Sequence, residues 1–552
     1  MRNTTRYLCA AAYLDDGFRD RVIAEYVEDE HRAVAPGGGY DLSAVVRHCL
    51  HARRLVLYRD LVLMALIVLA LVIAPAGARP ALGVLLWTGG LLWARGWTSA
   101  ARVLTFLFVL WLLYIMLSAL AALVFGSFTM SAGWGVRLAL GVGFQFFGFL
   151  VVVVECGHVV LVYRLMRHTL HPLSAVPAPA SPNPRLDGAL ARLSAAQRGN
   201  VSLYSSHPFL GSGTLRKEWA IVLELDRKAP DAPDGAPKVD AARLHARVWQ
   251  RIGEMKHPDA DDPASLAPHE SVVGLEGPQM HVVANGRLAQ YTRPLGIDGQ
   301  VVSGHPLVDS AGLPYSRATH EAVEAILTHP QGALRCYQRI SVDSRGQLVC
   351  ARDGAVVSPP EDQDVATTAF LHVAVEGRML YAQFVATAHT PVAREFKIVD
   401  ALPSVADRSL AWLALRTRWQ EIPKTAALCW SRAFRTLLHM GVAALRADMA
   451  RPQHLTTYDY GYRICPRELA GSAGYDTYIQ LLDTDKYIRL IERRVNEAIL
   501  DYLSDECGID VSAYREQMTA ITNNSVRITG STITGSQINT GAGAVQNQTK
   551  VS

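Results

Sequence analysis

The stretch TAFLHVAVEGRMLYAQFVATA, Thr368–Ala388, carries the clearest fold signal in this 552-residue chain. Two runs of apolar, β-branched and aromatic residues flank Glu376-Gly377, and such a pattern around a turn residue is typical of a β-hairpin. Strand-forming runs also occur at Glu218–Asp226 (EWAIVLELD) and Leu334–Val342 (LRCYQRISV). We therefore expect a sheet built around this hairpin.

Helical periodicity interrupts these strands at Asp240–Lys256 and Ser316–Thr328. The first of these helices has an apolar face made of Leu244, Val248, Ile252 and Met255. Apolar residues spaced three or four apart predict amphipathic helices. The region that contains them is therefore expected to be an α+β domain.

From Asp407 to Gly508 helix signals dominate, with Ser409–Met449 interrupted around Pro423. The helix expected at Asp485–Cys507 has an apolar stripe made of Tyr487, Ile491, Val495, Ala498 and Tyr502. Gly508 is well placed to end this helix. Three turns of pattern favour ordinary core packing over a coiled coil, so we expect a helical subdomain.

The composition indicates a chain that lives partly in lipid. Half of the residues are hydrophobic and 19% are charged, a smaller charged share than in most water-soluble proteins. A formal net charge of +4 gives no general basic field, so nucleic acid is not expected as a partner. The eight cysteines form no C-x-x-C pair and no metal-ligand spacing, so no metal, other cofactor or disulfide framework is expected.

Four apolar runs predict a membrane domain of two helical hairpins: 61–74, 81–93, 103–125 and 138–162. At about 1.5 Å per residue, the last two are long enough to cross a hydrocarbon core of roughly 30 Å. The first two are shorter and are joined by PAGARP, Pro75–Pro80, so they either cross a thinned bilayer or form a re-entrant hairpin.

Arginines in the short loops predict the orientation of this membrane domain. Seven lie on one side (Arg53, Arg54, Arg59, Arg95, Arg102, Arg164 and Arg167) and two on the other (Arg79 and Arg137). Because positive loops stay inside, both termini are expected in the cytoplasm of a bacterial cell, with the chain multi-pass in its plasma membrane. No cleavable signal peptide is expected.

Glu155 and His158 form a polar cluster inside the fourth apolar run. Ionisable residues within a span are candidates for a proton or ion path, since an unpaired carboxylate in lipid is costly. The alternative is a structural tie, in which water, Arg95 or Arg102 satisfies Glu155 near the end of the helix. We favour the tie, because a path needs a second carboxylate in another span.

A stripe of small residues, Ser118, Ala122 and Gly126, recurs at every fourth position of the third run. Small residues at this spacing let two helix backbones approach closely. Such stripes pack helices within one chain as often as between chains, so association of the chain with itself is left open.

Two further motifs resemble chemical sites but lack residues that such sites need. The glycine-rich PFLGSG, Pro208–Gly213, lacks the lysine and spacing of a phosphate-binding P-loop, so a tight turn is expected. HEAVE, His320–Glu324, lacks the second histidine of a zinc-protease helix, so an exposed helix face is expected. No motif supports an enzyme.

The tail SVRITGSTITGSQINTGAGAVQNQ, Ser525–Gln548, repeats a strand-favouring pattern at Ile528, Ile533 and Ile538. Three short repeats cannot build a core, so the tail is disordered, docks as edge strands on its own domain, or pairs with other copies. The segment loosely resembles the amyloid-signalling motifs of bacterial immune effectors, although Asn539 stands where their pattern has glycine. We expect docking or disorder first and self-assembly second.

Three stretches carry a resemblance to a known family: RYLCAAAYLDDGFRDRVI with RAVAP and RHCLHARR (6–54), NVSLYSSHPFLGSG (200–213) and TDKYIRLIERRVNEAILDYLSDECGIDVSAYREQMTAITNN (484–524). The chain resembles uncharacterised actinobacterial, Streptomyces-like, multi-pass membrane proteins of unknown function. Arginine far outnumbers lysine, as in chains from GC-rich genomes. Because that family has no assigned activity, the resemblance implies an architecture and a source but no site.

These observations together predict six segments. They are a cytoplasmic helical segment 1–54, a transmembrane domain 55–168, a proline-rich linker 169–187, a cytoplasmic α+β domain 188–405, a helical subdomain 406–520 and the tail 521–552. The expected function is a non-enzymatic membrane scaffold or signalling protein whose α+β domain binds other cytoplasmic proteins, with the lipid bilayer as a further partner. The alternatives are a small channel or transporter using Glu155 and His158, and a membrane-disrupting effector clustered by its tail.

Overall fold

The computed structural model describes most of the chain. The described residues are 2–73, 132–172, 178–180, 184–225, 238–256, 271–287, 293–295, 300–302, 307–309, 312–418, 422–449 and 458–524. The chain divides into two compact units whose segments alternate along the sequence. The first unit takes 1–30, 41–191 and 393–452, and the second takes 31–40, 192–392 and 453–552.

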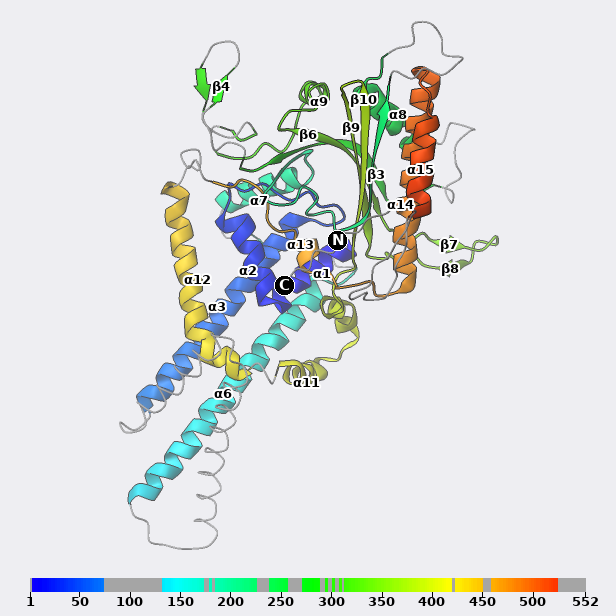
Figure 1. Ribbon diagram of the computed structural model, residues 1–552. Coiled ribbons are helices and arrows are strands. Elements are labelled where there is room, and N and C mark those ends of the chain that lie inside the picture. Colours follow the sequence, from blue (N-terminus) through cyan, green and yellow to red (C-terminus); the bar gives the residue numbers. More distant parts are fainter. Residues whose placement is uncertain are drawn as a thin grey trace. The chain divides into compact units, whose positions relative to one another are not determined.

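The first unit is helical in its described part (Figure 1). Its elements are α1 (Asn3–Leu14), α2 (Asp16–Ile23), η1 (Ala24–Glu28), α3 (Leu42–Ile73), α6 (Ala132–Thr169), η2 (Arg394–Lys397), α10 (Ile398–Ala401), η3 (Leu402–Ser404), α11 (Asp407–Arg418) and α12 (Ile422–Met449). Helix α7 (Pro184–Gln197) begins in this unit and ends in the second.

The second unit is an α+β fold. Its strands are β1 (Val201–Tyr204), β2 (Thr214–Glu224), β3 (Leu275–Asn285), β4 (Arg293–Leu295), β5 (Gln300–Val302), β6 (Arg335–Asp343), β7 (Val349–Cys350), β8 (Val356–Ser358), β9 (Ala366–Glu376) and β10 (Met379–His389). Its remaining helices are α8 (Ala241–Gly253), α9 (His320–Leu327), α13 (Pro466–Leu469), α14 (Tyr478–Asp501), η5 (Tyr502–Glu506) and α15 (Ser512–Asn524).

Six strands form one mixed sheet in the order β1-β3-β6-β9-β10-β2. The β1–β3 pair is parallel and the other four pairs are antiparallel. Strand β2 lies at one end of this order, so within the described chain it is paired only on its β10 side.

The hairpin expected at Thr368–Ala388 is confirmed as β9 and β10. Glu376 pairs with Met379, which leaves Gly377 and Arg378 as a two-residue turn. Both turn residues have positive φ, +55° and +62°, as a type I′ turn requires. Glycine adopts this conformation without strain, which explains why the turn falls here.

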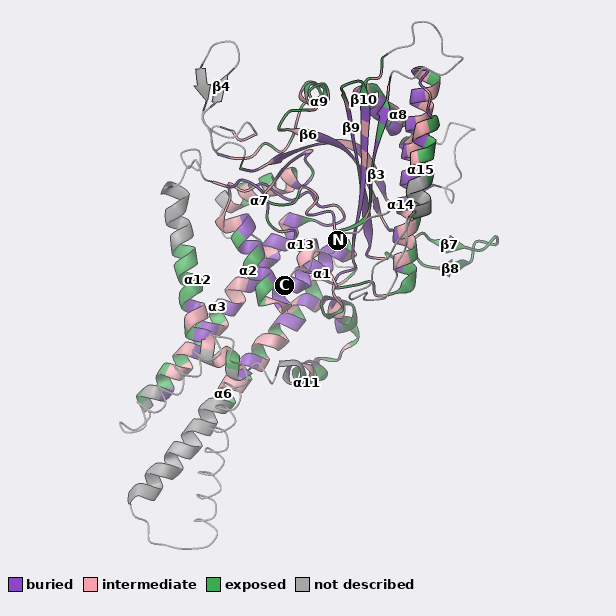
Figure 2. Ribbon diagram, in the orientation of Figure 1, coloured by how far each residue is buried: buried purple, intermediate pink, exposed green. Residues whose placement is uncertain are grey.

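The main hydrophobic core lies between one face of the sheet and helices α8, α14 and α15 (Figure 2). The strands contribute alternate residues, as the two-residue period of a strand requires. The expected helical faces are confirmed: Leu244, Val248 and Ile252 on α8, and Ile491 and Val495 on α14, are all fully buried.

Helix α14 begins earlier than its apolar stripe predicted. Thr477 caps its first turn, and the Gln480 side chain accepts a hydrogen bond from the Thr477 backbone amide. This reciprocal capping box satisfies amides that would otherwise lack partners at the helix end. After η5, Gly508 adopts φ +61°, the left-handed conformation expected of a residue that ends a helix.

The glycine-rich segment PFLGSG forms the expected tight turn, and its amides do bind an anion. The backbone amides of Gly211 and Gly213 both donate to Glu468 Oε1, at 2.7 Å and 2.9 Å. The anion is therefore a side chain of the protein itself. Both glycines have φ near +95°, and His389 Nε2 lies 3.0 Å from the Gly211 carbonyl oxygen.

Gly213→Ala is expected to destabilise the second unit by about 3 kcal/mol or more, because a Cβ there would collide with the Ala388 backbone in a strained conformation. Chemical denaturation of the full chain measures this loss. Gly377→Ala is the matched control, since φ is also positive there but nothing lies within 4 Å of the added Cβ. Equal losses for the two variants would contradict close packing at Gly213.

Four histidines are buried in the described part of the second unit, and burial lowers the pKa of each: His245, His281, His372 and His389. Two of these four, His245 and His281, each lie against a polar side chain. His245 Nδ1 lies 3.0 Å from Gln338 Oε1, and burial lowers the pKa of His245 to about 4. His281 Nε2 lies 2.6 Å from Ser202 Oγ, and burial together with Arg339 lowers the pKa of His281 to about 3. Each histidine therefore takes up a proton more readily in the unfolded chain.

Stability of this unit should fall as pH drops from 7 towards 4. An unfolded histidine protonates near pH 6.5 but a folded one with a lowered pKa does not, so the unfolded state gains protons. His245 and His281 should each cost about 2 kcal/mol between pH 7 and pH 5. Denaturant midpoints measured across this range should be less pH-dependent in His245→Gln, whereas His320→Gln, at an exposed histidine of α9, should leave the slope unchanged.

The expected four-span membrane domain is wrong. In the described part of the chain one helix, Phe149–Thr169, is long and apolar enough to cross a membrane, and the second unit is α+β with a six-stranded mixed sheet. Residues 61–73 of the first run form the end of α3, and run 138–162 lies in α6. Residue 74 and the runs 81–93 and 103–125 lie outside the described residues. The multi-pass location in a bacterial membrane loses its support with these spans.

The prediction of four spans failed because hydropathy does not distinguish a helix that packs on lipid from one that packs on protein. Helices α3 and α6 contact each other, and α3 also contacts α1 and α12. Leu63 of α3, Met166 of α6 and Leu170, which follows α6, are fully buried. Other apolar residues of these helices remain exposed, among them Val68 and Val72 of α3 and Phe149 and Leu161 of α6.

Candidate functional site

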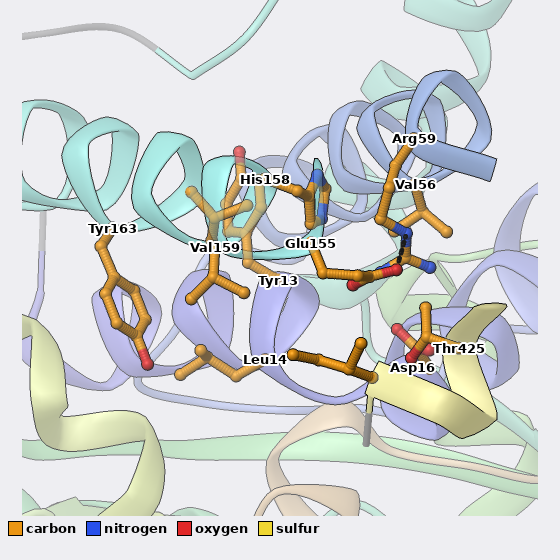
Figure 3. A pocket seen from close by; sticks show the side chains of 12 residues that line it. Tyr13, Leu14, Asp16, Val56, Arg59, Glu155, His158, Val159, Tyr163 and Thr425 are labelled. Atoms are coloured by element: carbon orange, nitrogen blue, oxygen red, sulfur yellow. Dashed lines mark ion pairs between the residues drawn. The ribbon is translucent and has the colours of Figure 1, made fainter. Parts of the chain in front are cut away.

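Glu155 and His158 line a small pocket in the first unit, as Figure 3 shows. The two side chains come from one face of α6. The remaining lining residues come from α1, α2, α3, α6 and α12: Tyr13, Leu14, Asp16, Val56, Arg59, Val159, Val162, Tyr163, Ile422 and Thr425. The structure therefore brings the predicted pair together and adds residues from elsewhere in the sequence.

The Glu155 carboxylate faces Arg59 of α3, with Oε1 at 3.7 Å from Arg59 Nε. Glu155 is 5% exposed, so its charge lies largely out of water. The sequence named Arg95 or Arg102 as partners, but both lie outside the described residues. A guanidinium from α3 instead provides the positive charge.

Asp60 lies at the centre of a stronger ion cluster beside this pocket. Its carboxylate is 1% exposed and accepts two hydrogen bonds from Arg432 of α12, at 3.0 Å and 2.9 Å. Arg59 donates two more, at 3.1 Å and 2.9 Å. Burial alone would lower the pKa of Arg432, but its hydrogen bonds with Asp60 outweigh that effect and raise it.

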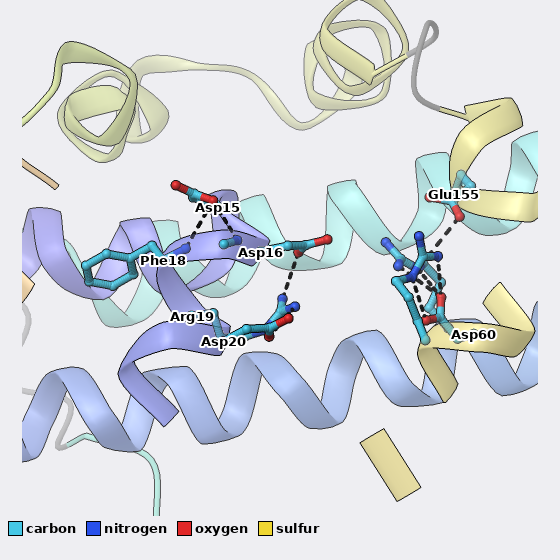
Figure 4. A network of polar contacts seen from close by, with 10 residues as sticks. Asp15, Asp16, Phe18, Arg19, Asp20, Asp60 and Glu155 are labelled. Carbon is cyan, nitrogen blue, oxygen red and sulfur yellow. Dashed lines mark hydrogen bonds and ion pairs between the residues drawn. The ribbon is translucent and has the colours of Figure 1, made fainter. Parts of the chain in front are cut away.

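Arg19 forms ion pairs with two aspartates at the start of α2 (Figure 4). Arg19, which is 3% exposed, donates to Asp16 at 2.8 Å and to Asp20 at 3.1 Å. Asp15 caps the helix by accepting hydrogen bonds from the amides of Gly17 and Phe18. Asp15, Asp16 and Asp20 therefore each accept a hydrogen bond from a residue of α2.

The pocket has a volume of about 60 Å³, which holds a few waters but not a metabolite. It shares residues with an open cleft of about 950 Å³, large enough for a ligand. That cleft carries charges of both signs, with Asp15, Asp16 and Glu395 facing Arg394, Lys397, Lys424 and Arg432. It therefore shows no preference for an anion or a cation.

This geometry favours the structural tie over a proton or ion path. A path needs titratable groups that exchange protons along a route, and a guanidinium does not release its proton. Glu155 faces Arg59, and Asp60 is held by two guanidiniums. Buried charges arranged in this way hold helices α3, α6 and α12 in register.

Sequence reasoning missed Asp60 and Arg432, although one signal for Asp60 was present. An aspartate beside Arg59 at the start of an apolar helical run needs a partner when that run is buried. Nothing in the sequence identified Arg432, which lies far along the chain. The packing stripe Ser118, Ala122 and Gly126 and the tail residues Ile528, Ile533 and Ile538 lie outside the described residues.

A second candidate surface lies in the α+β unit, at the outer edge of β2. Residues Trp219–Leu223 form an uncharged run on this edge, and Val222 is 50% exposed. Open strand edges present unpaired backbone amides and carbonyls, and proteins usually protect them with charges. The first part of β2 has such charges at Arg216, Lys217 and Glu218, but Trp219–Leu223 has none.

A comparison with protein families shows which part of the chain belongs to a known domain. Residues 218–539, more than half of the chain, match the AbeC-like domain. The chain belongs to the AbeC-like domain family. This match supports the expected membership of an uncharacterised family. No curated protein and no solved structure matches the chain.

The AbeC-like region begins within β2 and covers every strand of the sheet after it, together with α8, α14 and α15. Glu155 and His158 lie outside it. The edge of β2 is therefore the candidate surface that belongs to the family domain.

Asp60→Asn is expected to destabilise the first unit by about 3–5 kcal/mol, because it leaves two guanidiniums without their buried counter-charge. Thermal unfolding of the full chain measures the loss. Asp187→Asn is the matched control, since its ion pair with Arg47 at 2.6 Å is more exposed and should cost about 1 kcal/mol or less. Similar losses in both variants would contradict the central role of Asp60.

Proposed function

We propose that this chain is a non-enzymatic scaffold or signalling protein whose α+β unit binds another protein. The observation that carries the proposal is the uncharged outer edge of β2, Trp219–Leu223. An extended segment of a partner adds to such an edge as a further strand, with backbone hydrogen bonds that supply the affinity. At Val222 that segment replaces the Gln517 side chain of α15, which donates to the Val222 carbonyl oxygen at 3.1 Å.

Exposed apolar side chains of the α+β unit fit a protein partner. Val222 is 50% exposed, and Tyr381 lies opposite it on β10. Elsewhere in the unit, at the start of α14, Tyr478 and Ile479 are 67% and 61% exposed. Exposed apolar groups of this kind favour a protein partner over a small polar molecule.

The most enzyme-like pair in the described chain does not argue for catalysis. Ser202 Oγ lies 2.6 Å from His281 Nε2, the spacing of a nucleophile and its base. Both residues are only 1% exposed, so a substrate has no access to them. Burial lowers the pKa of His281 to about 3, which makes it a weak base.

An actinobacterial source is part of this proposal. It is supported by the excess of arginine over lysine and by the resemblance of three stretches of the chain to actinobacterial proteins. A strand-binding scaffold in such a cell would act through its partners and not through turnover of a substrate.

Val222→Pro is expected to abolish partner binding while the sheet stays intact. Proline is tolerated on an edge strand where its missing amide faces away from the ladder. Val222→Ala removes the same side chain but keeps the amide, so it should retain binding. Proximity labelling in cells that produce each variant should show a set of neighbours lost only with proline.

Two outcomes would contradict the proposal. One is an unchanged set of labelled neighbours in Val222→Pro. The other is turnover of nucleotides or phosphoesters by the purified chain that a point substitution in the α+β unit abolishes.

A further inference from the structure

Helix α12 of the first unit has an exposed apolar face (Figure 2). The face consists of four large side chains that are between 47% and 65% exposed: Trp430, Phe434, Leu437 and Leu438. At 3.6 residues per turn these side chains fall within an arc of about 100°, which is the width of a typical apolar helix face. The exposed apolar residues of α12 therefore form one continuous surface.

The opposite side of α12 holds this helix in the first unit. Arg432 donates two hydrogen bonds to the Asp60 carboxylate of α3. His439 Nδ1 lies 3.3 Å from Glu28 Oε2 of η1, and Cys429 is fully buried. These contacts determine which side of α12 packs on the unit, so the apolar face points away from it.

The charges of α12 have one sign over most of its length. No acidic residue occurs in 422–447, whereas four basic residues do: Lys424, Arg432, Arg435 and Arg446. Arg435 is exposed and lies beside the apolar face, about 60° around the helix from Leu438. A long basic side chain at such a border reaches phosphate groups while the apolar side chains beside it enter hydrocarbon.

Exposed apolar side chains also occur on the helices beside α12, which favours a lipid surface over a protein partner. Helix α12 contacts α3 and α6. Val68 and Val72 of α3 are exposed, as are Phe149 and Leu161 of α6. A protein partner needs a complementary shape, whereas a bilayer accepts apolar side chains from several helices. Tryptophan and basic residues along an apolar face are typical of helices that lie in the plane of a membrane interface.

We propose that α12 lies in the interface of a bilayer with anionic phospholipids, with its apolar face in the outer acyl layer and Arg435 at the lipid phosphates. Contact of this kind requires no helix that spans the bilayer. It goes beyond the proposed function, because it gives the first unit a lipid ligand, whereas the outer edge of β2 lies in the second unit.

Flotation of the purified full chain with lipid vesicles tests this contact. Vesicles of phosphatidylcholine with about one third phosphatidylglycerol should bind the chain about tenfold more tightly than vesicles of phosphatidylcholine alone. Phe434→Glu should weaken binding by about tenfold, because a carboxylate replaces an inserted aromatic ring. Tyr478→Glu is the matched control, since Tyr478 of the second unit is 67% exposed and Phe434 is 65% exposed.

Two further measurements separate insertion of this face from general surface charge. Arg435→Gln should weaken binding to the anionic vesicles by about fivefold. Arg493→Gln, at an exposed arginine of α14, should leave binding unchanged. Phosphatidylcholine with brominated acyl chains quenches the fluorescence of tryptophans that contact it, so Trp430→Phe should keep its affinity for vesicles and lose part of the quenching.

Equal binding by Phe434→Glu and Tyr478→Glu would overturn the proposal. Equal binding to neutral and anionic vesicles, or no binding to either, would do the same. Quenching that Trp430→Phe leaves unchanged would show that another part of the chain meets the bilayer. A loss of labelled neighbours in Phe434→Glu, with vesicle binding unchanged, would assign the face to a protein partner. None of these results concerns Val222, so each would leave the proposed function standing.

Discussion

The two-residue turn at Gly377 and Arg378 determines the register of β9 against β10, and the rest of the α+β unit depends on that register. A shift by one residue would turn every side chain of both strands to the opposite face. Phe384 and Leu371, which pair across the hairpin and face the helices, would then leave the core. Strand β2 pairs with β10, so its inward Trp219, Ile221 and Leu223 follow the same register.

That register also connects the sheet to α14 through a buried carboxylate. Glu492 of α14 accepts hydrogen bonds from Trp219 Nε1 at 2.9 Å and from Lys217 Nζ at 2.8 Å. Glu492 is 8% exposed, so its charge requires both donors. These hydrogen bonds anchor β2 to α14 on the core side of the sheet. An anchored edge strand suits the proposed pairing with a strand of a partner.

The first unit depends on charge compensation in the same way. Asp60 and Glu155 are nearly buried, and each lies against a guanidinium from another segment or helix. Such pairs add little net stability relative to apolar packing, but breaking one partner leaves an uncompensated charge. Their main effect is to select one arrangement of α3, α6 and α12 out of many apolar alternatives.

The sequence by itself determined the local elements. The hairpin, α8 and the buried stripe of α14 follow from periodicity and turn residues, because these signals act between residues close in the chain. The tertiary structure alone decided that Arg59 and not Arg95 or Arg102 faces Glu155, that Glu468 fills the Gly211–Gly213 turn, and that β2 lies at the open edge. It also decided that α3 and α6 pack on other helices, where apolar composition had indicated four spans. These outcomes depend on contacts between residues far apart in the sequence, whose partners local patterns do not specify.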